Sequence, residues 1–331
     1  MRILVTGGAG YVGGFTARHL LETGHDVVVL DNLGTGHREA VPTELLVVGD
    51  IGVRSDLERI FSEHTFDALM HFSASAYVGE SVRDPRTYYR NNIANTLTLL
   101  ETMLDHDIRR LVFSSTCAVY AETAEMPLRE DALQDPASPY AFSKLAIERM
   151  IRDFSRAYGL DHVLLRYFNA AGACADGTHG EDHRPETHLI PLALQTILGQ
   201  YEKLDVFGSD YPTPDGTCIR DYVHVEDLAQ AHELALRALM EEPRGEVSRT
   251  YNIGTGTGHS VMEVLQMSER ITGSRVPHEL TERRPGDTAR LVASSEKIRR
   301  ELGWKPRYED LEPIVTSAWE WHRSHPKGYA S

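Results

Sequence analysis

The sequence contains little cysteine and no long apolar run. The three cysteines, Cys117, Cys174 and Cys218, are odd in number and scattered, and their spacing is not that of metal ligands. We therefore expect no disulfide framework and no metal site, and this usage favours a reducing, cytoplasmic location. No stretch approaches the ~20 apolar residues that span a bilayer. Because a strand-like segment begins at Met1–Val5, we expect no signal peptide.

Positive charge is also scarce. The 331 residues include 34 lysines and arginines against 49 aspartates and glutamates, which gives a net charge of −15. Such a surface repels nucleic acid and anionic membranes, so neither is an expected partner. An anionic small molecule would need a local basic site. Hydrophobic residues make up 41% of the chain and charged residues 25%, which are values typical of a globular protein.

The first half of the chain is rich in β-branched runs that alternate with helical stretches. This order is typical of the α/β class, and specifically of a Rossmann-type, doubly wound parallel sheet. We expect this domain to cover residues 1–168. Its expected strands lie at 2–6, 26–31, 44–49, 67–71, 109–115 and 161–166, and its helices at 11–23, 53–63, 84–106 and 138–157.

Regularity falls after Asn169. Residues 172–187 and 208–217 are rich in loop-forming residues, and we expect loops there. We interpret residues 169–331 as a smaller α+β domain that forms a lid over the ends of the sheet. Its expected elements are a strand near 250–253 and helices near 221–240, 260–272, 294–301 and 310–323. The segment 219–240 is expected to pack back on the first domain.

A glycine-rich segment, TGGAGYVG, lies between the first strand and the first helix. Gly7, Gly10 and Gly13 fit one dinucleotide-binding spacing, and Gly8, Gly10 and Gly13 fit another, so the sequence does not separate the two. Either set brings a helix N-terminus against a pyrophosphate. Asp31, at the end of the second strand, can bind both ribose hydroxyls of NAD and would repel the 2′-phosphate of NADP. The segment therefore predicts an NAD site.

Tyr140 and Lys144 lie four residues apart in an expected helix, so their side chains share one face. Ionisation of a tyrosine near pH 7 requires its pKa to fall by about 3 units, or about 4 kcal/mol. One positive charge at ~5 Å supplies about 3 kcal/mol at an effective dielectric of ~20. Lys144 could therefore make Tyr140 a base, with help from a positively charged nicotinamide. A Tyr–Lys pair at this spacing also arises by chance in many helices.

Thr116 ends the fifth strand, where the crevice residues of an open α/β sheet lie. Its hydroxyl could hydrogen-bond the oxygen being oxidised, or it could cap its own loop. The glycine segment, this hydroxyl and the Tyr-x-x-x-Lys helix occur together and in this order. In that combination the chain resembles the extended short-chain dehydrogenase/reductase superfamily.

Further segments narrow the resemblance. They are HFSA at 71–74, VGES at 78–81, LRYFN at 165–169, DYPTPDGT at 210–217, RDYVHVEDL at 220–228 and RRPGD at 283–287. With them the chain resembles the UDP-glucose 4-epimerase family over about residues 1–328. The stretch from 211 to 228 is far more specific than the cofactor motif.

The resemblance implies a role for each matching residue. Tyr140 would take the proton of the sugar 4-hydroxyl, Lys144 would bind the nicotinamide ribose and lower the tyrosine pKa, and Thr116 would assist. Bound NAD would accept hydride from C4 and return it to the other face of a 4-keto sugar. The implied NAD contacts are Gly7, Gly10, Tyr11, Val12, Gly13, Asp31, Asn32, Asp50, Ile51, Phe72, Ser73, Ala74, Asn91, Ser114, Tyr140, Lys144 and Tyr167. The implied UDP-sugar contacts are Thr116, Tyr140, Asn169, His188, Leu189, Phe207, Arg220, Arg284, Asp287 and Leu291.

Three positions depart from the family pattern. Ala76, followed by Tyr77, stands where a cofactor-contacting lysine is common, and His188 stands where some members have asparagine. Leu291 stands where a bulky tyrosine is associated with excluding N-acetylhexosamines. We therefore expect UDP-GlcNAc and UDP-GalNAc to be accepted beside UDP-glucose and UDP-galactose.

Three other functions stay open. A 4,6-dehydratase is disfavoured because Cys117 and Ala118, rather than an Asp-Glu pair, follow Thr116. The sequence does not distinguish an epimerase of UDP-glucose and UDP-galactose from a 4-epimerase of UDP-arabinose or UDP-glucuronate. A non-catalytic NAD sensor would be expected to lose Tyr140 or Lys144. The family typically forms homodimers through helices that correspond to 84–106 and 138–157, and the first of these has a broad apolar face.

Overall fold

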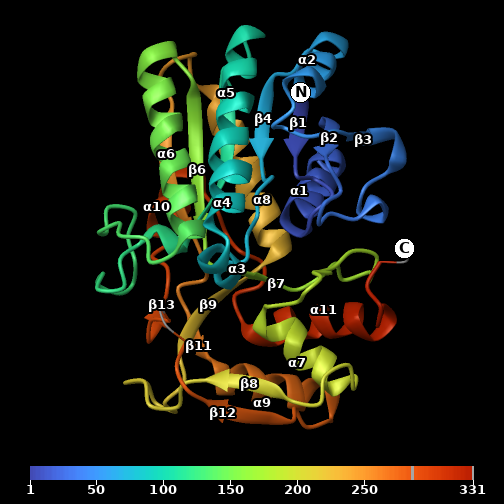
Figure 1. Ribbon diagram of the computed structural model, residues 1–331, viewed down its shortest axis with the longest axis vertical. Helices are drawn as coiled ribbons and strands as arrows, with labels where there is room; N and C mark the ends of the chain where they lie inside the picture. Colours follow the sequence, from blue (N-terminus) through green and yellow to red (C-terminus); the bar gives the residue numbers. More distant parts are fainter. Residues whose placement is uncertain (285–286, 330–331) are drawn as a thin grey trace.

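The computed structural model describes residues 1–284 and 287–329. Its central sheet has seven parallel strands in the order β10-β6-β5-β4-β1-β2-β3 (Figure 1). The order reverses between β1 and β4, which is where open α/β sheets bind ligands. The strands are β1 (Arg2–Thr6), β2 (Asp26–Asp31), β3 (Leu46–Val48), β4 (Ala68–His71), β5 (Arg110–Thr116), β6 (Asp161–Tyr167) and β10 (Ser248–Ile253). The predicted Rossmann-type fold is confirmed.

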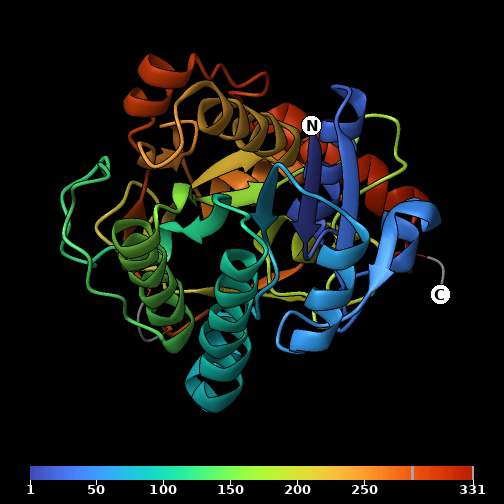
Figure 2. The same ribbon diagram turned by 90° about the horizontal axis from the view of Figure 1, so that it is seen from above.

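Alternate residues of each strand enter two separate cores. Ile3 and Val5 of β1 pack with one set of helices, whereas Leu4 packs with the set on the opposite face. Figure 2 shows these two helical layers on either side of the sheet. The first set is α1 (Tyr11–Glu22), α8 (Val225–Glu241) and α10 (Glu296–Leu302), and the second is α2 (Arg54–Glu63), α5 (Asn95–Asp105) and α6 (Pro139–Tyr158). Because both faces are buried, the strands are apolar throughout.

Two predicted helices differ from the structure. The helix expected at 84–106 consists of α4 (Pro85–Tyr88), a π-helical turn (Tyr89–Ala94) and α5, and a separate helix α3 (Val78–Arg83) precedes it. The helix expected at 221–240 begins only at Val225, because residues 219–224 form strand β9. The side chain of His224 caps the helix by accepting the backbone N–H of Glu226 at 3.1 Å.

The second part of the chain is built around β9. Strands β7 (Asn169–Ala171), β11 (Gly258–Ser260) and β13 (Arg290–Leu291) pair with β9 (Ile219–His224), and β8 (Leu204–Phe207) pairs with β12 (His278–Thr281). Figure 1 shows this part next to the carboxyl ends of the large sheet. Its helices are α7 (Leu189–Ile197), α9 (Val261–Thr272) and α11 (Leu311–Ser324), and short 3-10 turns elsewhere in the chain lie at Arg38–Ala40, Thr43–Leu45 and Cys117–Val119.

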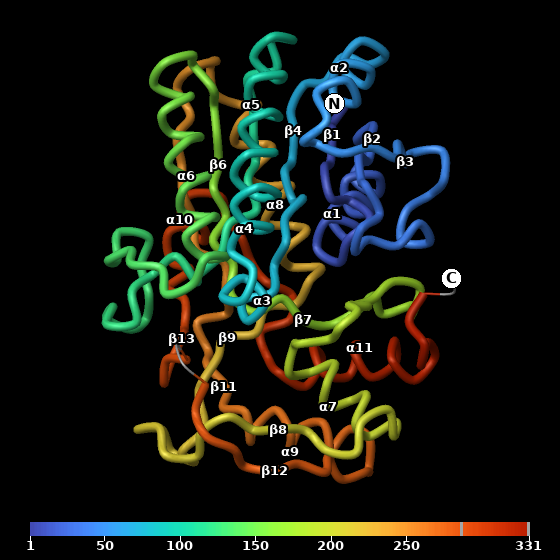
Figure 3. The backbone as a smooth tube through the Cα atoms, viewed as in Figure 1, coloured from blue at the N-terminus to red at the C-terminus, as the bar shows by residue number. Residues whose placement is uncertain are grey.

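The chain returns to the large sheet after it has entered the second part, as the tube in Figure 3 traces. Leu228 and Leu236 of α8 share a core with Leu20 of α1. Strand β10, which the sequence placed within the second half, forms the edge of the large sheet, where Tyr251 pairs with Leu165 of β6. Among the described residues, no helix has both the length and the apolarity to cross a membrane.

Candidate active site

The turn between β1 and α1 is closed by contacts that only glycine permits. Gly7 has φ +74°, and a Cβ there would lie 2.5 Å from a backbone nitrogen of the loop after β4. A Cβ on Gly13 would lie 2.2 Å from the Gly7 carbonyl oxygen. Gly10 is the N-cap of α1, and a Cβ there would stay 3.4 Å from its nearest neighbour. Its missing side chain therefore leaves the helix N-terminus open to an anion. Gly8 instead packs against the side chain of Val29.

Asp31 closes β2 beside this turn and is 7% exposed. Its carboxylate accepts the backbone N–H groups of Ala9 at 3.0 Å and Leu33 at 2.8 Å. Burial raises the pKa of Asp31, and these two hydrogen bonds oppose that rise. Nearby, Asn32 donates a hydrogen bond to Asp50 at 2.9 Å. The two hydrogen bonds thus fix the Asp31 carboxylate next to the glycine turn, as a ribose-binding acid requires.

The other predicted cofactor contacts lie at or near the carboxyl ends of neighbouring strands. The ring of Phe72 lies 4.7 Å from that of His232, and the Ser114 and Tyr167 hydroxyls are 2.6 Å apart. Tyr11 donates to the Gly172 carbonyl at 2.6 Å. Ser73 and Ala74 follow β4, Val12 lies in the first turn of α1, and Ile51 is buried at the start of the loop before α2.

Helix α6 positions Tyr140 and Lys144 at the end of β5. The helix begins with Pro139, directly after Ser138, whose hydroxyl accepts the backbone N–H of Ala141 at 3.2 Å. Lys144 is 3% exposed, and its ammonium donates to the Ser114 carbonyl oxygen at 2.8 Å. The structure therefore brings the predicted lysine to the backbone of the predicted strand end.

Burial dominates the electrostatics of this pair. Desolvation raises the pKa of Tyr140 well above its usual range, and the Thr116 hydroxyl acts in the opposite direction. Desolvation also lowers the pKa of Lys144 to about 7, although the charge of Glu148 partly restores it. In the protein itself the pKa of Tyr140 is thus raised rather than lowered, which differs from the sequence-based expectation.

Thr116 is 8% exposed at the end of β5. Its Oγ1 accepts the backbone N–H of Ala118 at 3.2 Å, so the hydroxyl caps its own turn. The proton of the hydroxyl is not used in that contact and can still be donated. The two interpretations of Thr116 are therefore compatible.

Asn92 connects three parts of the site and was missed by the sequence analysis. It is fully buried in the π-helical turn, accepts the backbone N–H of Ser75 at 2.8 Å and donates to the Ser143 hydroxyl at 2.9 Å. Its predicted neighbour Asn91 donates to the Ser75 hydroxyl at 3.0 Å. π-helical turns are frequent at functional sites. The one sequence feature that could have indicated Asn92 is a polar residue at a position where the helix faces the interior.

A buried ion pair supports the catalytic helix from behind. Glu148 and Arg166 are both fully buried, with a shortest N–O distance of 2.6 Å. Glu148 also accepts a hydrogen bond from the Ser115 hydroxyl at 2.6 Å. The pair thus joins α6 to β5 and β6 one turn beyond Lys144. The sequence analysis missed it, although Glu148 lies at i+4 from Lys144.

A basic pair lies on the side of the second part. Asp287 bridges Arg220, at 3.3 Å, and Arg284, at 3.0 Å. The Arg284 guanidinium lies 4.5 Å from the centre of the Phe207 ring. The structure therefore brings together four residues that the sequence assigned to substrate. Pro285 and Gly286 of the RRPGD segment lie outside the described residues.

Leu291 and Asn169 connect the two parts of the site. Leu291 pairs with Arg220 in register and packs with the buried cluster that contains Cys117 and Phe168. The Asn169 amide donates to the Asp221 carbonyl at 3.0 Å. The residue that follows Thr116 is therefore in the same cluster as the predicted specificity residue.

Two predicted substrate residues have other surroundings. His188 contacts Glu181 and lies among three residues that the sequence analysis did not select, Glu181, His183 and Glu186. Leu189 begins α7 and packs against the cores shared with α9.

The chain matches known proteins over its length. Residues 3–254 match the family described as NAD dependent epimerase/dehydratase. A UDP-glucose 4-epimerase of Halalkalibacterium halodurans is 50% identical, over 100% of this chain and 98% of the relative. A crystal structure of a UDP-glucose 4-epimerase has a TM-score of 0.95 at 45% identity, covering 100% of both chains. The structure of the Brucella ovis enzyme in complex with NAD has a TM-score of 0.92 at 45% identity, covering 96% and 97%. The chain belongs to the UDP-glucose 4-epimerase family of NAD-dependent epimerases and dehydratases.

Proposed function

We propose that the protein catalyses the reversible 4-epimerisation of a UDP-hexose, with UDP-glucose and UDP-galactose as the main pair. The observation that carries this proposal is the combination of two features. Tyr140, Thr116 and Lys144 meet at the end of β5, and the Arg220–Asp287–Arg284 group lies on the part of the chain that faces the ends of the strands. The Tyr140–Thr116–Lys144 group suits the interconversion of an alcohol and a ketone, and the two arginines suit the binding of a diphosphate.

NAD is the cofactor that the residues fit. A Cβ on Gly7 or Gly13 would collide with backbone atoms, so the turn can approach a pyrophosphate closely. The Asp31 carboxylate, held at the end of β2, suits ribose hydroxyls and opposes a 2′-phosphate. When bound, NAD supplies the hydride acceptor and donor for C4 of the sugar.

Tyr140 acts as the base and then as the acid. It takes the proton from the 4-hydroxyl as C4 is oxidised and gives it back when the 4-keto sugar is reduced. Because burial raises the pKa of Tyr140, the proton transfer depends on positive charge close to the phenol. Lys144 and an oxidised nicotinamide provide that charge, and Thr116 donates to the same sugar oxygen.

The arginines hold the nucleotide while the sugar turns. Arg220 and Arg284 supply charge-assisted hydrogen bonds to the diphosphate, and they offset the local repulsion of a chain with net charge −15. Phe207 and Asp287 keep the two guanidinium groups in place. Asn169, His188 and Leu189 are further proposed substrate contacts. Epimerisation requires firm binding of UDP and loose binding of the hexose, so that both faces of C4 can be presented.

We propose that Leu291 leaves room for an N-acetyl group in the sugar pocket. It is smaller than tyrosine and packs beside Cys117, the residue that follows Thr116. We therefore propose that UDP-GlcNAc and UDP-GalNAc are also substrates. A 4,6-dehydratase is disfavoured because burial raises the pKa of the Cys117 thiol to about 12, so this position provides no acid or base near pH 7.

The test is an assay of purified protein with UDP-galactose, UDP-GalNAc, UDP-arabinose and UDP-glucuronate, with separation of the product sugars. We expect UDP-glucose from UDP-galactose, together with bound nucleotide that is recovered as NAD. Conversion of UDP-arabinose or UDP-glucuronate alone would reassign the substrate. Loss of water from the sugar would indicate a dehydratase.

We also propose a homodimer through the π-helical turn, α5 and α6. Tyr89, Leu97 and Phe142 are 40%, 38% and 48% exposed there, and the rings of Tyr89 and Phe142 are 5.9 Å apart. The outer sides of α5 and α6 face away from the rest of the ribbon in Figure 2. Light scattering should give about twice the chain mass of 37.1 kDa. Leu97→Glu should give monomers, and Leu280→Glu on β12 should not.

A cytoplasmic location stays part of the proposal. Its support is that Cys117, Cys174 and Cys218 are all free and buried, which suits a reducing compartment. The domain division is also proposed: residues 1–168 for NAD and 169–331 for the nucleotide-sugar, with α8 and β10 of the second half packed back on the first.

A further inference from the structure

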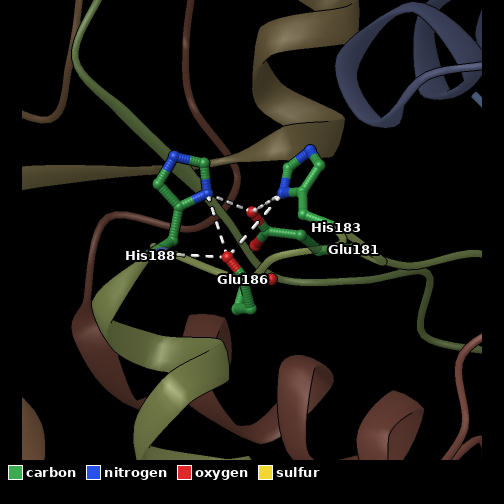
Figure 4. A group of neighbouring side chains, drawn as sticks. All are labelled: Glu181, His183, Glu186 and His188. Atoms are coloured by element: carbon green, nitrogen blue, oxygen red, sulfur yellow. Dashed lines mark hydrogen bonds and ion pairs between the residues drawn. The ribbon is translucent and has the colours of Figure 1, made fainter. Parts of the chain in front are cut away.

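Four side chains of the loop between β7 and α7 converge on one point. They are Glu181, His183, Glu186 and His188, and Figure 4 shows the two carboxylates between the two imidazole rings. One ligand-type atom from each side chain lies within 4.8 Å of the other three. The spacing E-x-H-x-x-E-x-H is local, so one short loop supplies the whole set.

The distances suit ligands of one ion. His183 Nδ1 lies 3.1 Å from Glu181 Oε1 and 3.8 Å from Glu186 Oε1, and His188 Nδ1 lies 3.7 Å from Glu186 Oε1. Ligands at ~2.0–2.1 Å in a tetrahedral zinc site are about 3.3–3.4 Å apart. His188 also hydrogen-bonds Glu181 directly. The side chain of His188 is 53% exposed, so it can adjust to release that contact.

Hydrogen bonding leaves part of this cluster unsatisfied. His183 Nδ1 and Glu186 Oε2 are buried and have no hydrogen-bond partner among the described residues. His183 Nδ1 thus lies at ion-pair distance from Glu181 Oε1, but the contact does not have hydrogen-bond geometry. An unsatisfied buried polar atom costs about 1–3 kcal/mol. Coordination of a cation by His183 Nδ1, and by both oxygens of Glu186 rather than Oε1 alone, would remove that cost.

Burial makes the charge of the cluster significant. The side chains of Glu181 and Glu186 are 3% and 1% exposed. Two buried carboxylates are stable only with matching positive charge. The backbone N–H groups of Thr187 and His188 reach one oxygen of Glu186, at 2.6 and 2.8 Å, and they orient that carboxylate as second-sphere hydrogen bonds do in metal sites.

We propose that these four residues form a structural site for a divalent transition metal of the Zn²⁺ type, with a His₂Glu₂ ligand set. Imidazole and carboxylate are both ordinary zinc ligands, and four protein ligands leave no open position for catalysis. Two carboxylates and a dication are electrically neutral together.

The site has an access route and a structural consequence. A cavity of about 300 Å³ is lined by Glu181, His183 and Glu186, together with residues of α11 and the chain after it. On another side, the ring of His183 lies 6.2 Å from the rings of Tyr11 and Tyr77. A metal would therefore fix the loop that leads into α7 against the segment that begins α1. The ion stabilises this junction, and its role is structural because all four positions are filled by protein ligands.

The test uses full-length protein without a polyhistidine tag. After incubation with Zn²⁺ and gel filtration, metal analysis should find one zinc per chain, and the melting temperature should rise with free Zn²⁺. Loss of a residue that only hydrogen-bonds a metal ligand typically weakens metal binding by about 10–100-fold. His183→Gln and Glu186→Gln remove ligands themselves, so each should weaken zinc binding by more than that. His325→Gln, which changes a residue lining the same cavity, should bind zinc as the wild type does.

Cobalt provides a second measurement that does not depend on variants. Co²⁺ bound to the wild type should give the visible absorption of tetrahedral coordination, and Zn²⁺ should displace it. Wild-type protein without stoichiometric zinc, cobalt with only a hydrated, six-coordinate spectrum, or folded His183→Gln protein that binds zinc normally would each overturn the proposal. In that case the cluster is a hydrogen-bonded ion-pair network.

Discussion

The ammonium of Lys144 donates a hydrogen bond to the carbonyl oxygen of Ser114 at 2.8 Å. This contact ties the first two turns of α6 to a backbone atom of β5 two residues before Thr116. The lysine is therefore fixed by the protein itself, and its charge is placed without help from a ligand. Because the Lys144 side chain is 3% exposed, its charged form loses most of its hydration.

The buried amine should make stability depend on pH. Burial lowers the pKa of Lys144 to about 7, so the unfolded chain binds more protons at this residue between about pH 7 and its unfolded pKa of about 10.4. Stability should therefore rise with pH in that window, by on the order of 1 kcal/mol per pH unit at most. Lys144→Met should remove this rise. Denaturant unfolding of the two proteins at equal cofactor content measures it, and parallel pH profiles would refute the assignment.

Tyr140→Phe should abolish most of the epimerase activity. Loss of a general acid–base group typically costs about 10²–10⁴ in rate, while the fold and bound NAD should be retained. The matched control is Tyr158→Phe, which changes an exposed tyrosine at the other end of α6. The measurement is kcat with UDP-galactose together with the nucleotide content. Activity close to that of the control would rule out Tyr140 as the base.

Arg284→Gln should act on substrate binding rather than on the proton transfer. A hydrogen bond to a charged group contributes about 1.5–3 kcal/mol, so KM should rise about 10- to 150-fold with a smaller change in kcat. Arg283→Gln is the control, because Arg283 pairs with Asp210 and lies over Tyr211 instead. Equal effects of the two changes would argue against a diphosphate role specific to Arg284.

Leu291→Tyr should narrow the sugar pocket. The added ring would enter space beside Cys117 and Phe168, so turnover of UDP-GalNAc should fall at least about tenfold more than turnover of UDP-galactose, a difference of about 1.4 kcal/mol. Leu291→Met, of similar volume, should leave the ratio unchanged. If the wild type does not turn over UDP-GalNAc at high enzyme concentration, the role given to Leu291 is wrong.

The Glu148–Arg166 pair should be required for stability. Removal of one partner leaves a fully buried charge unpaired. Such a loss typically lowers the free energy of unfolding by about 3–5 kcal/mol. Glu148→Gln should therefore lower the free energy of unfolding strongly. The double variant Glu148→Gln, Arg166→Met should recover part of the loss. A double variant less stable than either single variant would show that the hydrogen bonds, rather than the charge, dominate.

The fold followed from patterns that are local in sequence. The apolar runs of β1, β2, β4, β5 and β6 predict strands because both faces of a parallel sheet are buried. The prediction was wrong for residues 221–224. These residues are all buried, so they lack the alternation that distinguishes a strand from a buried helix. They form a strand because β9 pairs with β7, β11 and β13. That pairing is between distant segments and is not visible in a window of residues.

The site divides in the same way. The glycine turn, Asp31, Thr116, Tyr140 and Lys144 belong to motifs of fixed spacing, and the structure places them at the carboxyl ends of the strands of the large sheet or beside those ends. Asn92 and Glu148 have no such motif, because their roles arise from contacts with Ser75, Ser143 and Arg166. The Glu181–His188 cluster is local in sequence, but cysteine spacing alone was used to judge metal binding, and the set contains no cysteine.

The placement of β10 has a consequence for synthesis of the chain. Strand β6 ends at Tyr167, but its outer neighbour, the strand ending at Ile253, is made 86 residues later. At roughly 5–20 residues per second, the edge of β6 stays unpaired for about 4–17 s on the ribosome. An open, apolar strand edge recruits other strands, so the nascent chain passes through an interval in which it is prone to aggregation, and residues up to Ile253 have to emerge before the sheet is complete.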